Sequence, residues 1–290
     1  ELDTNASYLI TGGIGALGLQ VAQYLAAHGA CHLVLTGRSG VSTDDQRTAL
    51  QALEHAGVKI EVFAADVSNV DDVKKVISSM PNLRGIVHAA GILDDGMLMQ
   101  QSPDRFIKVA GPKVSGAWHL HSQTLDRPLD FFILFSSVAS IIGSPGQSNY
   151  AAANAFMDGL AQYRKQQGLV ATAINWGPWA DVGMASSDIV LQRLMKDGWQ
   201  PMNAGQGCNF IGHLLTARDL PQAAVLPIDW GQFASNIPGA NNWSILSHLV
   251  PKERSSPLVG NAAELAAQQV KKALPDQRID LISSYLLERI

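Results

Sequence analysis

The sequence predicts an α/β fold, a doubly wound parallel sheet completed by a helical lid. Up to Trp179, short apolar runs alternate with amphipathic segments, which is the pattern of parallel strands covered by helices on both faces. The apolar runs end in Gly, Ser, Asp or Asn, the small and polar residues expected at the sheet edge where ligands bind. Together these observations favour a sheet that binds a ligand at the carboxyl ends of its strands.

The expected elements follow in chain order. Strands are expected at 7–11, 31–37, 59–66, 85–91, 131–137, 170–176 and 223–230, and helices at 15–29, 43–56 and 70–79. Residues 181–207 hold a helical segment between glycines and are expected to form a mobile lid. We predict one domain over residues 1–250. Over 251–290 we predict a linker and a helical lead into a further domain, which would make the chain a piece of a longer polypeptide.

The composition gives no support for nucleic-acid-binding, membrane-spanning or zinc-binding proteins. The chain has 290 residues, 47% hydrophobic and 16% charged, with a net charge of −4; this is the composition of a globular protein and gives no reason to expect nucleic-acid binding. We find no signal peptide and no membrane-spanning segment. Cys31 and Cys208 lie in apolar contexts and predict two buried thiols in a reducing compartment, the cytoplasm. No Cys or His cluster has zinc spacing, so no metal site is expected.

A glycine loop follows the first strand. Gly13, Gly15 and Gly18 have G-x-G-x-x-G spacing and precede a helix with Leu17 on its apolar stripe. Such glycines let a pyrophosphate approach the backbone at a helix amino end, where the N–H groups and the helix dipole favour an anion. The motif is common by itself, but its position between a strand and a helix predicts a dinucleotide site.

The second strand indicates which dinucleotide. It ends in Thr36-Gly37-Arg38-Ser39 and has no acid for a ribose 2′-hydroxyl. Arg38 can pair with a 2′-phosphate and Ser39 can donate to it, which favours NADPH over NADH. A solvated surface arginine is the alternative. Asp66, at the end of the third strand, is expected either to contact the adenine or to cap the following helix.

Tyr150 is a candidate proton donor. Ser137, at the end of a strand, can donate a hydrogen bond to a carbonyl oxygen while Tyr150 delivers the proton. A phenol with a pKa of about 10 is a weak acid unless a cation stabilises the phenolate, and Asn154, four residues later, carries no charge. Lys113 lies one position from the apolar stripe of a predicted helix and can reach inward. A structural tyrosine, an exposed lysine and a surface amide are the alternatives.

These residues resemble one known family. Ser137, Tyr150 and Asn154, with "PKVSGAWHL" upstream, resemble the ketoreductase domains of modular polyketide synthases, Rossmann-like members of the short-chain dehydrogenase/reductase superfamily. The resemblance runs from about Tyr8 to Trp230 over several motifs, among them "LITGGIGALG", "LTGRSG" and "VHAAGILDDG". It implies that Lys113 is the cation, that Ser137 orients the ketone, that Tyr150 donates the proton and that Asn154 supports the network.

The resemblance also implies a cofactor set and a stereochemical class. Besides the residues above, the NADPH contacts would be Thr11, Gly12, Leu17, Val67, Ala89, Ala90, Gly91, Lys113, Tyr150 and Asn175. Leu93-Asp94-Asp95 resembles the LDD signature of B-type ketoreductases, which form the D (3R) alcohol, and the tryptophan that marks A-type domains just before the tyrosine is missing. Without the resemblance, Asp94 and Asp95 are turn residues before a glycine.

The implied function is NADPH-dependent reduction of a 3-oxoacyl thioester held on the phosphopantetheine of an acyl carrier protein. The implied neighbours are a structural subdomain that precedes such catalytic domains, an enoylreductase, and a carrier protein that follows residue 290. Alternatives are the ketoreductase of a fatty acid synthase, a free-standing short-chain alcohol dehydrogenase and a non-catalytic nucleotide-binding scaffold.

Overall fold

The computed structural model describes residues 2–180, 188–216, 220–237, 239–250, 270–271 and 277–278. The chain divides into two compact units, residues 1–238 and 239–290. The first unit contains the sheet and the candidate site described below. Most of the predicted linker and helical lead at 251–290 lies outside the described residues, as do residues 181–187 of the predicted lid, so these predictions remain predictions.

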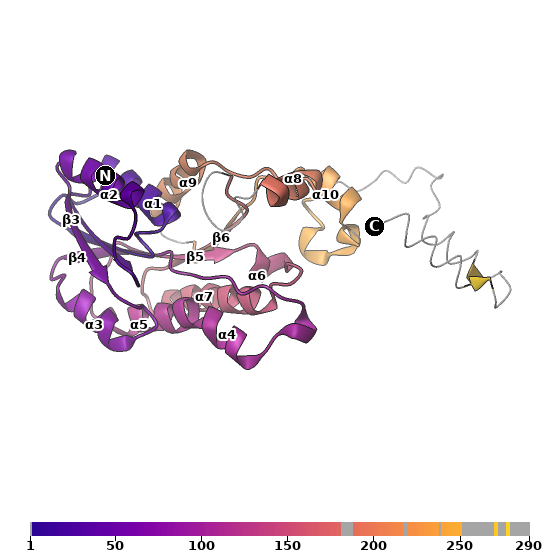
Figure 1. Cartoon of the computed structure of the whole chain (residues 1–290), viewed down its shortest axis with the longest axis horizontal. Helices are drawn as coiled ribbons and strands as arrows, with labels where there is room; N and C mark the ends of the chain where they lie inside the picture. The colour runs from indigo at the N-terminus through magenta and orange to yellow at the C-terminus, as the bar shows by residue number, and fades with distance from the viewer. Residues whose placement is uncertain are drawn as a thin grey trace. The chain divides into compact units, whose positions relative to one another are not determined.

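The first unit is built on a seven-stranded sheet in the order β3-β2-β1-β4-β5-β6-β7, with every neighbouring pair parallel (Figure 1). The strands are β1 (Ser7–Thr11), β2 (His32–Gly37), β3 (Lys59–Ala64), β4 (Leu83–His88), β5 (Phe131–Ser137), β6 (Thr172–Trp176) and β7 (Gln222–Val225). The predicted doubly wound parallel sheet is therefore confirmed. The seventh strand is shorter than predicted, because Pro227 soon follows it and cannot donate to a ladder.

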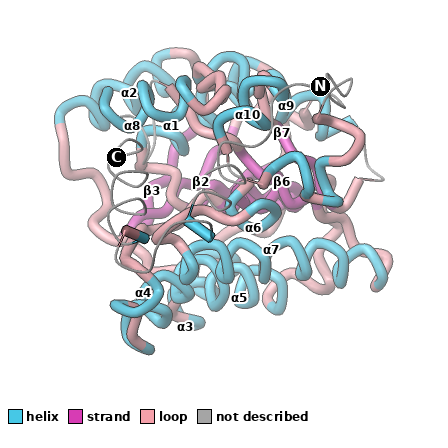
Figure 2. Tube along the Cα trace, turned by 90° about the vertical axis from the view of Figure 1, so that its right-hand side faces the viewer, coloured by secondary structure: helices cyan, strands magenta, loops and turns pink. Residues whose placement is uncertain are grey.

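Helices cover both faces of the sheet. Figures 1 and 2 show α3, α4, α5 and α7 on one side, and α1, α2 and α9 on the other. The helices are α1 (Ala16–Ala27), α2 (Asp44–His55), α3 (Val70–Ser78), α4 (Pro103–Ala110), α5 (Gly116–Ser122), α6 (Ala139–Ile142), α7 (Ser148–Gln166), α8 (Asp188–Lys196), α9 (Ala204–Thr216) and α10 (Trp230–Asn236). Short helical turns are η1 (Leu98–Gln100), η2 (Gly111–Ser115), η3 (Ala240–Asn242) and η4 (Ser244–Leu246). In the described ranges, no helix is long and apolar enough to cross a membrane.

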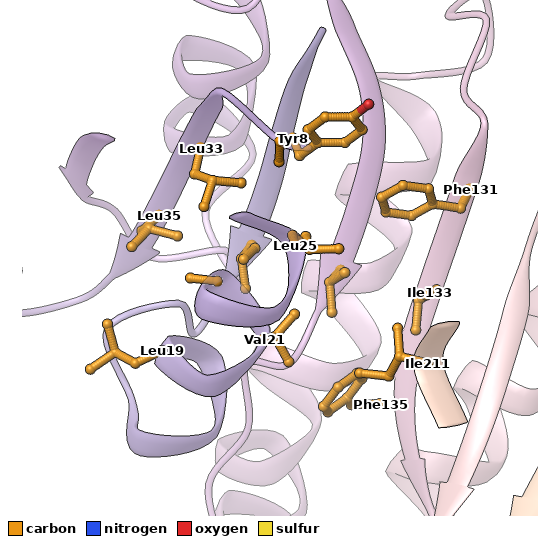
Figure 3. Packing of buried hydrophobic residues seen from close by; sticks show 14 of the residues in the cluster. Tyr8, Leu19, Val21, Leu25, Leu33, Leu35, Phe131, Ile133, Phe135 and Ile211 are labelled. Atoms are coloured by element: carbon orange, nitrogen blue, oxygen red, sulfur yellow. The ribbon is translucent and has the colours of Figure 1, made fainter. Parts of the chain in front are cut away.

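The core between α1 and the sheet follows directly from the apolar patterning. Val21 and Leu25 of α1 are fully buried and face Leu33, Phe131 and other strand residues in one cluster (Figure 3). Every residue of β1 is buried, as expected of a strand with helices on both faces. The continuous apolar strands are therefore explained by two-sided burial.

Leu25→Ala is expected to lower the free energy of unfolding by about 3 kcal/mol, because the side chain is 0% exposed and its removal leaves a cavity. The matched control is Leu98→Ala, since Leu98 is 74% exposed and its truncation is expected to change stability by less than about 0.5 kcal/mol. Urea denaturation of both variants measures the difference. Equal effects would contradict the assigned core.

Two details differ from or refine the sequence predictions. Cys208 is buried as predicted, but Cys31 is exposed, because it lies just before β2, outside the two-sided cover of the sheet. Helix α9 begins at Ala204, inside the range predicted as a lid, and packs against α1 with Ile211 fully buried. Met202, inside that range, is 1% exposed and belongs to the core cluster, so the end of the range contributes to the core.

Candidate active site

The parallel sheet brings the predicted site residues to one edge. Thr11 ends β1, Arg38 follows β2, Ala89 follows β4 and Ser137 ends β5. The strand order reverses direction between β1 and β4, and ligands of open α/β sheets bind outside the carboxyl ends of the strands at such a switch point. The candidate site lies at this edge.

The backbone around the glycine loop is packed too closely for side chains at three of its positions. Gly12 has φ +68°, and a Cβ there would lie 2.9 Å from the Ala89 backbone. A Cβ on Gly13 would lie 2.6 Å from the Ile10 carbonyl oxygen, and one on Gly18 would overlap the Gly12 backbone. Gly15 is the N-cap of α1 and provides no side-chain cap. The loop therefore fits a pyrophosphate at the amino end of α1, and part-buried Leu17 lies in the first turn of that helix.

The positively charged residue that the sequence predicts to bind a 2′-phosphate lies just after the end of β2. Arg38 and Ser39 are both exposed there, so they are accessible to a ligand at this edge. Asp66 is part-buried, and its carboxylate accepts a hydrogen bond from the Ser68 N–H at 2.8 Å. Helix α3 is instead capped by Asn69, so the helix-cap alternative for Asp66 is wrong.

A π-helical segment, η2 (Gly111–Ser115), joins α4 to α5 and contains Lys113, for which the sequence predicts an ordinary helix. Pro112 explains the difference, because proline has no N–H to continue the α-helical hydrogen bonds and its ring crowds the preceding turn. Lys113 in this turn is buried, whereas its neighbour Val114 is only part-buried.

Lys113 is 3% exposed and lies beside Tyr150. Its Nζ donates a hydrogen bond to the Phe135 carbonyl oxygen at 3.0 Å and lies 5.2 Å from the centroid of the Tyr150 ring. Gly91 makes this position possible, because a Cβ there would lie 2.9 Å from the lysine Cε. Burial lowers the pKa of Lys113 to about 7, against an opposing effect of the Asp158 charge.

Tyr150 is 9% exposed, in a small cluster with Val109 and Ala153. Burial raises the pKa of its phenol, while interactions with Asn154 and Ser137 lower it and the Asp95 charge raises it. The sequence predicts instead a phenol made more acidic by a cation. Burial is the largest of these effects, so Tyr150 keeps its proton at neutral pH.

Asn154 and Ser137 complete this group. Asn154 is 0% exposed, and its Nδ2 donates to the Tyr150 carbonyl oxygen at 2.8 Å, which excludes the surface-amide alternative. Its Oδ1 is buried and has no hydrogen-bond partner in the described part of the chain. The Ser137 Oγ accepts a hydrogen bond from the Ala139 N–H at 3.2 Å. The four residues thus gather at the ends of β5, η2 and α7.

The loop after β4 is held against α4. Leu93 packs on the cluster that contains Tyr150. The carboxylate of Asp94 accepts hydrogen bonds from Arg105 Nε at 2.8 Å and from Lys108 Nζ at 2.8 Å, and the hydrogen bond with Lys108 is the main reason that its pKa is lowered. Asp94 is therefore a charged anchor for the loop, a stronger attachment than a turn residue requires.

The first turn of α7 holds the same loop from the other side. Gln147 Nε2 donates to the Asp95 carboxylate at 2.9 Å, and Asn149 Nδ2 donates to the Asp94 carbonyl oxygen at 2.8 Å. Sequence reasoning missed these partners and the two cations of α4. No local signal could have identified them, since Gln147 is 52 residues from Asp95 in the chain.

The side chains of two predicted cofactor residues are hydrogen-bonded to other side chains of the protein. Asn175 is 0% exposed, and its Oδ1 accepts a hydrogen bond from Gln222 at 3.0 Å while its Nδ2 donates to Asp158 at 3.0 Å. The Asn175 side chain is therefore hydrogen-bonded within the protein, and the prediction that Asn175 contacts the cofactor stays a prediction. The Thr11 Oγ1 is 2.6 Å from Nδ1 of buried His88, which leaves only its backbone at the edge.

The remaining predicted cofactor residues are buried or part-buried at the same edge of the sheet. Val67 is 6% exposed and packs against α5, where a Cβ on Gly116 would lie 2.8 Å from its Cγ2. Ala90 and Gly91 are part-buried after β4. Trp176 and Trp179 are buried and packed edge to face with ring centroids 4.9 Å apart, so both are packing residues. Of the cavities in the described part of the chain, one of about 900 Å³ lies away from this site, at the amino ends of the strands beside Tyr8, Arg84 and Phe131.

Comparison with known proteins gives the family. A family model described as the KR domain matches residues 6–181. Polyketide synthase GfsA of Streptomyces halstedii is 37% identical over 287 residues, which are 94% of this chain and 4% of the relative. Spectinabilin polyketide synthase system protein NorB of Streptomyces orinoci is 39% identical over 234 residues, 78% of this chain and 11% of that relative. The chain thus spans a small part of these curated relatives.

Solved structures agree with this result. "Structure of A-type Ketoreductases from Modular Polyketide Synthase" matches with a TM-score of 0.77 and 36% identity, covering 81% of this chain and 51% of the other. "The first ketoreductase of the tylosin PKS" matches with a TM-score of 0.72 and 38% identity, covering 79% and 50%. The chain spans about half of each solved chain. From its sheet, its glycine loop and these matches, the chain belongs to the KR domain family, the nicotinamide-binding ketoreductase domains of polyketide synthases.

Proposed function

We propose that the chain uses NADPH to reduce a 3-oxoacyl thioester, carried by an acyl carrier protein, to the D (3R) 3-hydroxyacyl thioester within a polyketide synthase module. The observation that carries the proposal is the buried Lys113 ammonium 5.2 Å from the ring of Tyr150. Burying a lysine lowers the stability of the folded protein. Its position beside a phenol at the sheet edge is therefore better explained by a role in the reaction than by a role in folding.

Bound NADPH supplies a hydride to the β-carbon of the ketone. Ser137 donates a hydrogen bond to the ketone oxygen, which holds the carbonyl in place and stabilises the charge that develops on it. Tyr150 transfers its proton to the emerging alkoxide. The Lys113 ammonium then stabilises the negative charge left on the phenolate. Asn154, one helical turn away, orients Tyr150.

The pKa directions suit these roles. Burial raises the pKa of Tyr150, so the residue enters the reaction as a protonated donor. Burial lowers the pKa of Lys113 to about 7, so a neighbouring negative charge readily favours its protonated form. Burial is again the main cause that lowers the pKa of His88 to about 3, and this histidine therefore contributes no competing positive charge.

Arg38→Ala is expected to weaken NADPH binding by about 10- to 100-fold and to leave NADH binding nearly unchanged. The reason is that an exposed guanidinium at the end of β2 can pair with the 2′-phosphate that only NADPH carries. Fluorescence titration with both cofactors measures this. Arg47→Ala, on the exposed face of α2, is the control. Equal weakening of both cofactors by Arg38→Ala would contradict the NADPH assignment.

The loop of Leu93, Asp94 and Asp95 supports the D (3R) outcome. Leu93 packs beside Tyr150, and the two aspartates are held by α4 and by the start of α7. A loop fixed in this way can favour one direction of entry for the phosphopantetheine arm and so one face of the ketone.

The partners that we propose are the carrier protein, the preceding structural subdomain and an enoylreductase of the same multienzyme. The two unpaired cysteines suit a reducing cytoplasm.

The direct test is turnover of a carrier-bound 3-oxoacyl thioester with NADPH and with NADH, followed by chiral analysis of the alcohol. We expect turnover with NADPH, at least tenfold slower turnover with NADH, and a D (3R) product. An L product would contradict the role of the loop. NADPH binding without turnover would favour a non-catalytic scaffold, and preference for small free alcohols would favour a free-standing dehydrogenase.

A further inference from the structure

One arginine of α4, Arg105, contacts the loop after β4 along most of its length. Its Nε donates to the Asp94 carboxylate at 2.8 Å, and its Nη2 lies 2.6 Å from the same oxygen. Nη2 also donates to the Asp95 carbonyl oxygen, and Nη1 donates to the Gln100 carbonyl oxygen at 3.3 Å. A guanidinium holds its N–H donors in one fixed plane, so this side chain fixes the loop between residues 94 and 100.

Gly96, inside this loop, leaves the space that the guanidinium occupies. A Cβ on Gly96 would lie 2.5 Å from Arg105 Nη1 and 3.0 Å from its Cζ, so the guanidinium would have to move. The φ of Gly96 lies outside the left-handed region, so the backbone conformation there does not itself require glycine. The missing side chain at this position is therefore explained by close packing against the arginine.

The loop held by Arg105 lies against the proposed proton donor. Leu93, at the start of the loop, packs on the cluster that contains Tyr150. Asn149 joins the same two parts, because its Nδ2 donates to the Asp94 carbonyl oxygen at 2.8 Å and its Oδ1 accepts from the Tyr150 N–H at 2.8 Å. A displacement of the loop therefore changes the surface that a ketone would meet beside Tyr150.

We propose that Arg105 is the positioning residue that sets which face of the ketone receives the hydride. By fixing the loop, the guanidinium leaves one direction of entry open to the acyl arm and so turns one face of the β-carbon towards the cofactor. This proposal rests on the proposed function, because it needs a ketone as the substrate. It does not depend on which alcohol is formed, since the quantity that changes is the ratio of the two alcohols.

Arg105→Lys tests the proposal, because it keeps the positive charge and removes the planar group of donors. A lysine ammonium can pair with the Asp94 carboxylate but cannot also hold the two backbone carbonyl groups of the loop. The substrate is the 3-oxobutyryl thioester of a pantetheine analogue with NADPH, and chiral chromatography measures the products. We expect the ratio of the major to the minor alcohol to fall about tenfold or more, as a small misplacement of the ketone permits.

Gly96→Ala displaces the guanidinium without changing the arginine itself. Its methyl group would overlap Arg105 Nη1, so the variant should lower the product ratio as Arg105→Lys does. In an Arg105→Ala background the same methyl group meets empty space, and Gly96→Ala should then change the ratio by less than about twofold. Additive effects of the two substitutions would overturn the proposal, because they would show that Gly96 and Arg105 act independently.

Two further variants separate the shape of the arginine from its charge. Arg47→Lys makes the same substitution on α2, where Arg47 Nε and Nη2 likewise donate to one oxygen of Asp44 at an exposed site, and it should leave the ratio unchanged. Lys108→Met removes the second cation of Asp94 and should lower the ratio by less than about threefold. An unchanged ratio in Arg105→Lys, or an equal fall in Lys108→Met, would overturn the proposal.

A measurement without substrate distinguishes this proposal from the proposed function. The Gly96 N–H donates to the Gly146 carbonyl oxygen at 2.8 Å, and its hydrogen exchange, followed by NMR, should be about tenfold faster in Arg105→Lys than in the wild type. Unchanged exchange would overturn the proposal even if the chain is an active ketoreductase. Faster exchange in a chain without turnover would refute the proposed function, and the choice of face with it, and would leave Arg105 only as the residue that holds the loop.

Discussion

Turnover of a 3-oxoacyl thioester is expected to fall by about a thousandfold or more in Tyr150→Phe, because the variant has no proton to give to the alkoxide. The ring remains in its apolar cluster, so the free energy of unfolding should stay within about 1 kcal/mol of the wild type. NADPH affinity should remain near normal. Steady-state kinetics, urea denaturation and fluorescence titration measure the three quantities.

Tyr163→Phe is the matched control for this variant. Tyr163 lies on the same helix, α7, but is 43% exposed, and the same loss of a hydroxyl there should leave turnover within about twofold. Substantial turnover in Tyr150→Phe would refute the assignment of the proton donor. A loss of NADPH binding in that variant would show instead that the phenol serves the cofactor alone.

Lys113→Met is expected to lower turnover by about a hundredfold, because the phenolate left after proton transfer loses its cation. The methionine side chain is unbranched and of similar length, so it can occupy the same buried space. Stability at pH 7 should be unchanged or increase by about 1–4 kcal/mol, since a buried charged group is replaced by an apolar one. The variant would thus be less active without being less stable.

The stability of the wild type should also depend on pH through Lys113. Its pKa is lowered from 10.5 to about 7 by burial, so between these values the unfolded chain binds a proton that the folded chain does not. The free energy of unfolding therefore rises with pH from about 7 to 10.5. Lys113→Met should abolish this rise.

Chemical denaturation of wild type and variant at several pH values across that window measures the difference. Lys74→Met, at an exposed position on α3, should retain the wild-type pH dependence. Parallel curves for the wild type and Lys113→Met would contradict the burial of the lysine.

Local patterns were sufficient for the sheet and for the glycine loop. A fully buried parallel strand reads as a continuous apolar run, and the space around Gly12 and Gly18 is filled by backbone from the next strand or turn, so both leave a signal in the sequence. The approach of Lys113 to Tyr150 was predicted from its place beside an apolar stripe and from the family resemblance. The structure places Lys113 in a π-helical turn that also contains Pro112, which side-chain periodicity alone does not reveal.

The hydrogen bonds of Asn175 could not be predicted in the same way. Asn175 follows an apolar strand and has the residue type of a ligand contact, but Gln222 and Asp158 bind it from positions 47 and 17 residues away. The partners of Asp94 and Asp95 are likewise supplied by α4 and α7. Hydrogen bonds between distant elements depend on packing and rotamers, which have no periodic signature in the chain.

The most direct test of the account is the titration of Lys113 itself in the wild-type chain, followed by NMR of ¹³Cε-labelled lysine. An ammonium buried beside Tyr150 should titrate at about pH 7. A Lys113 resonance that titrates near 10.5, the value of a lysine in water, would place the side chain in solvent and would leave the proposed proton donor without its cation.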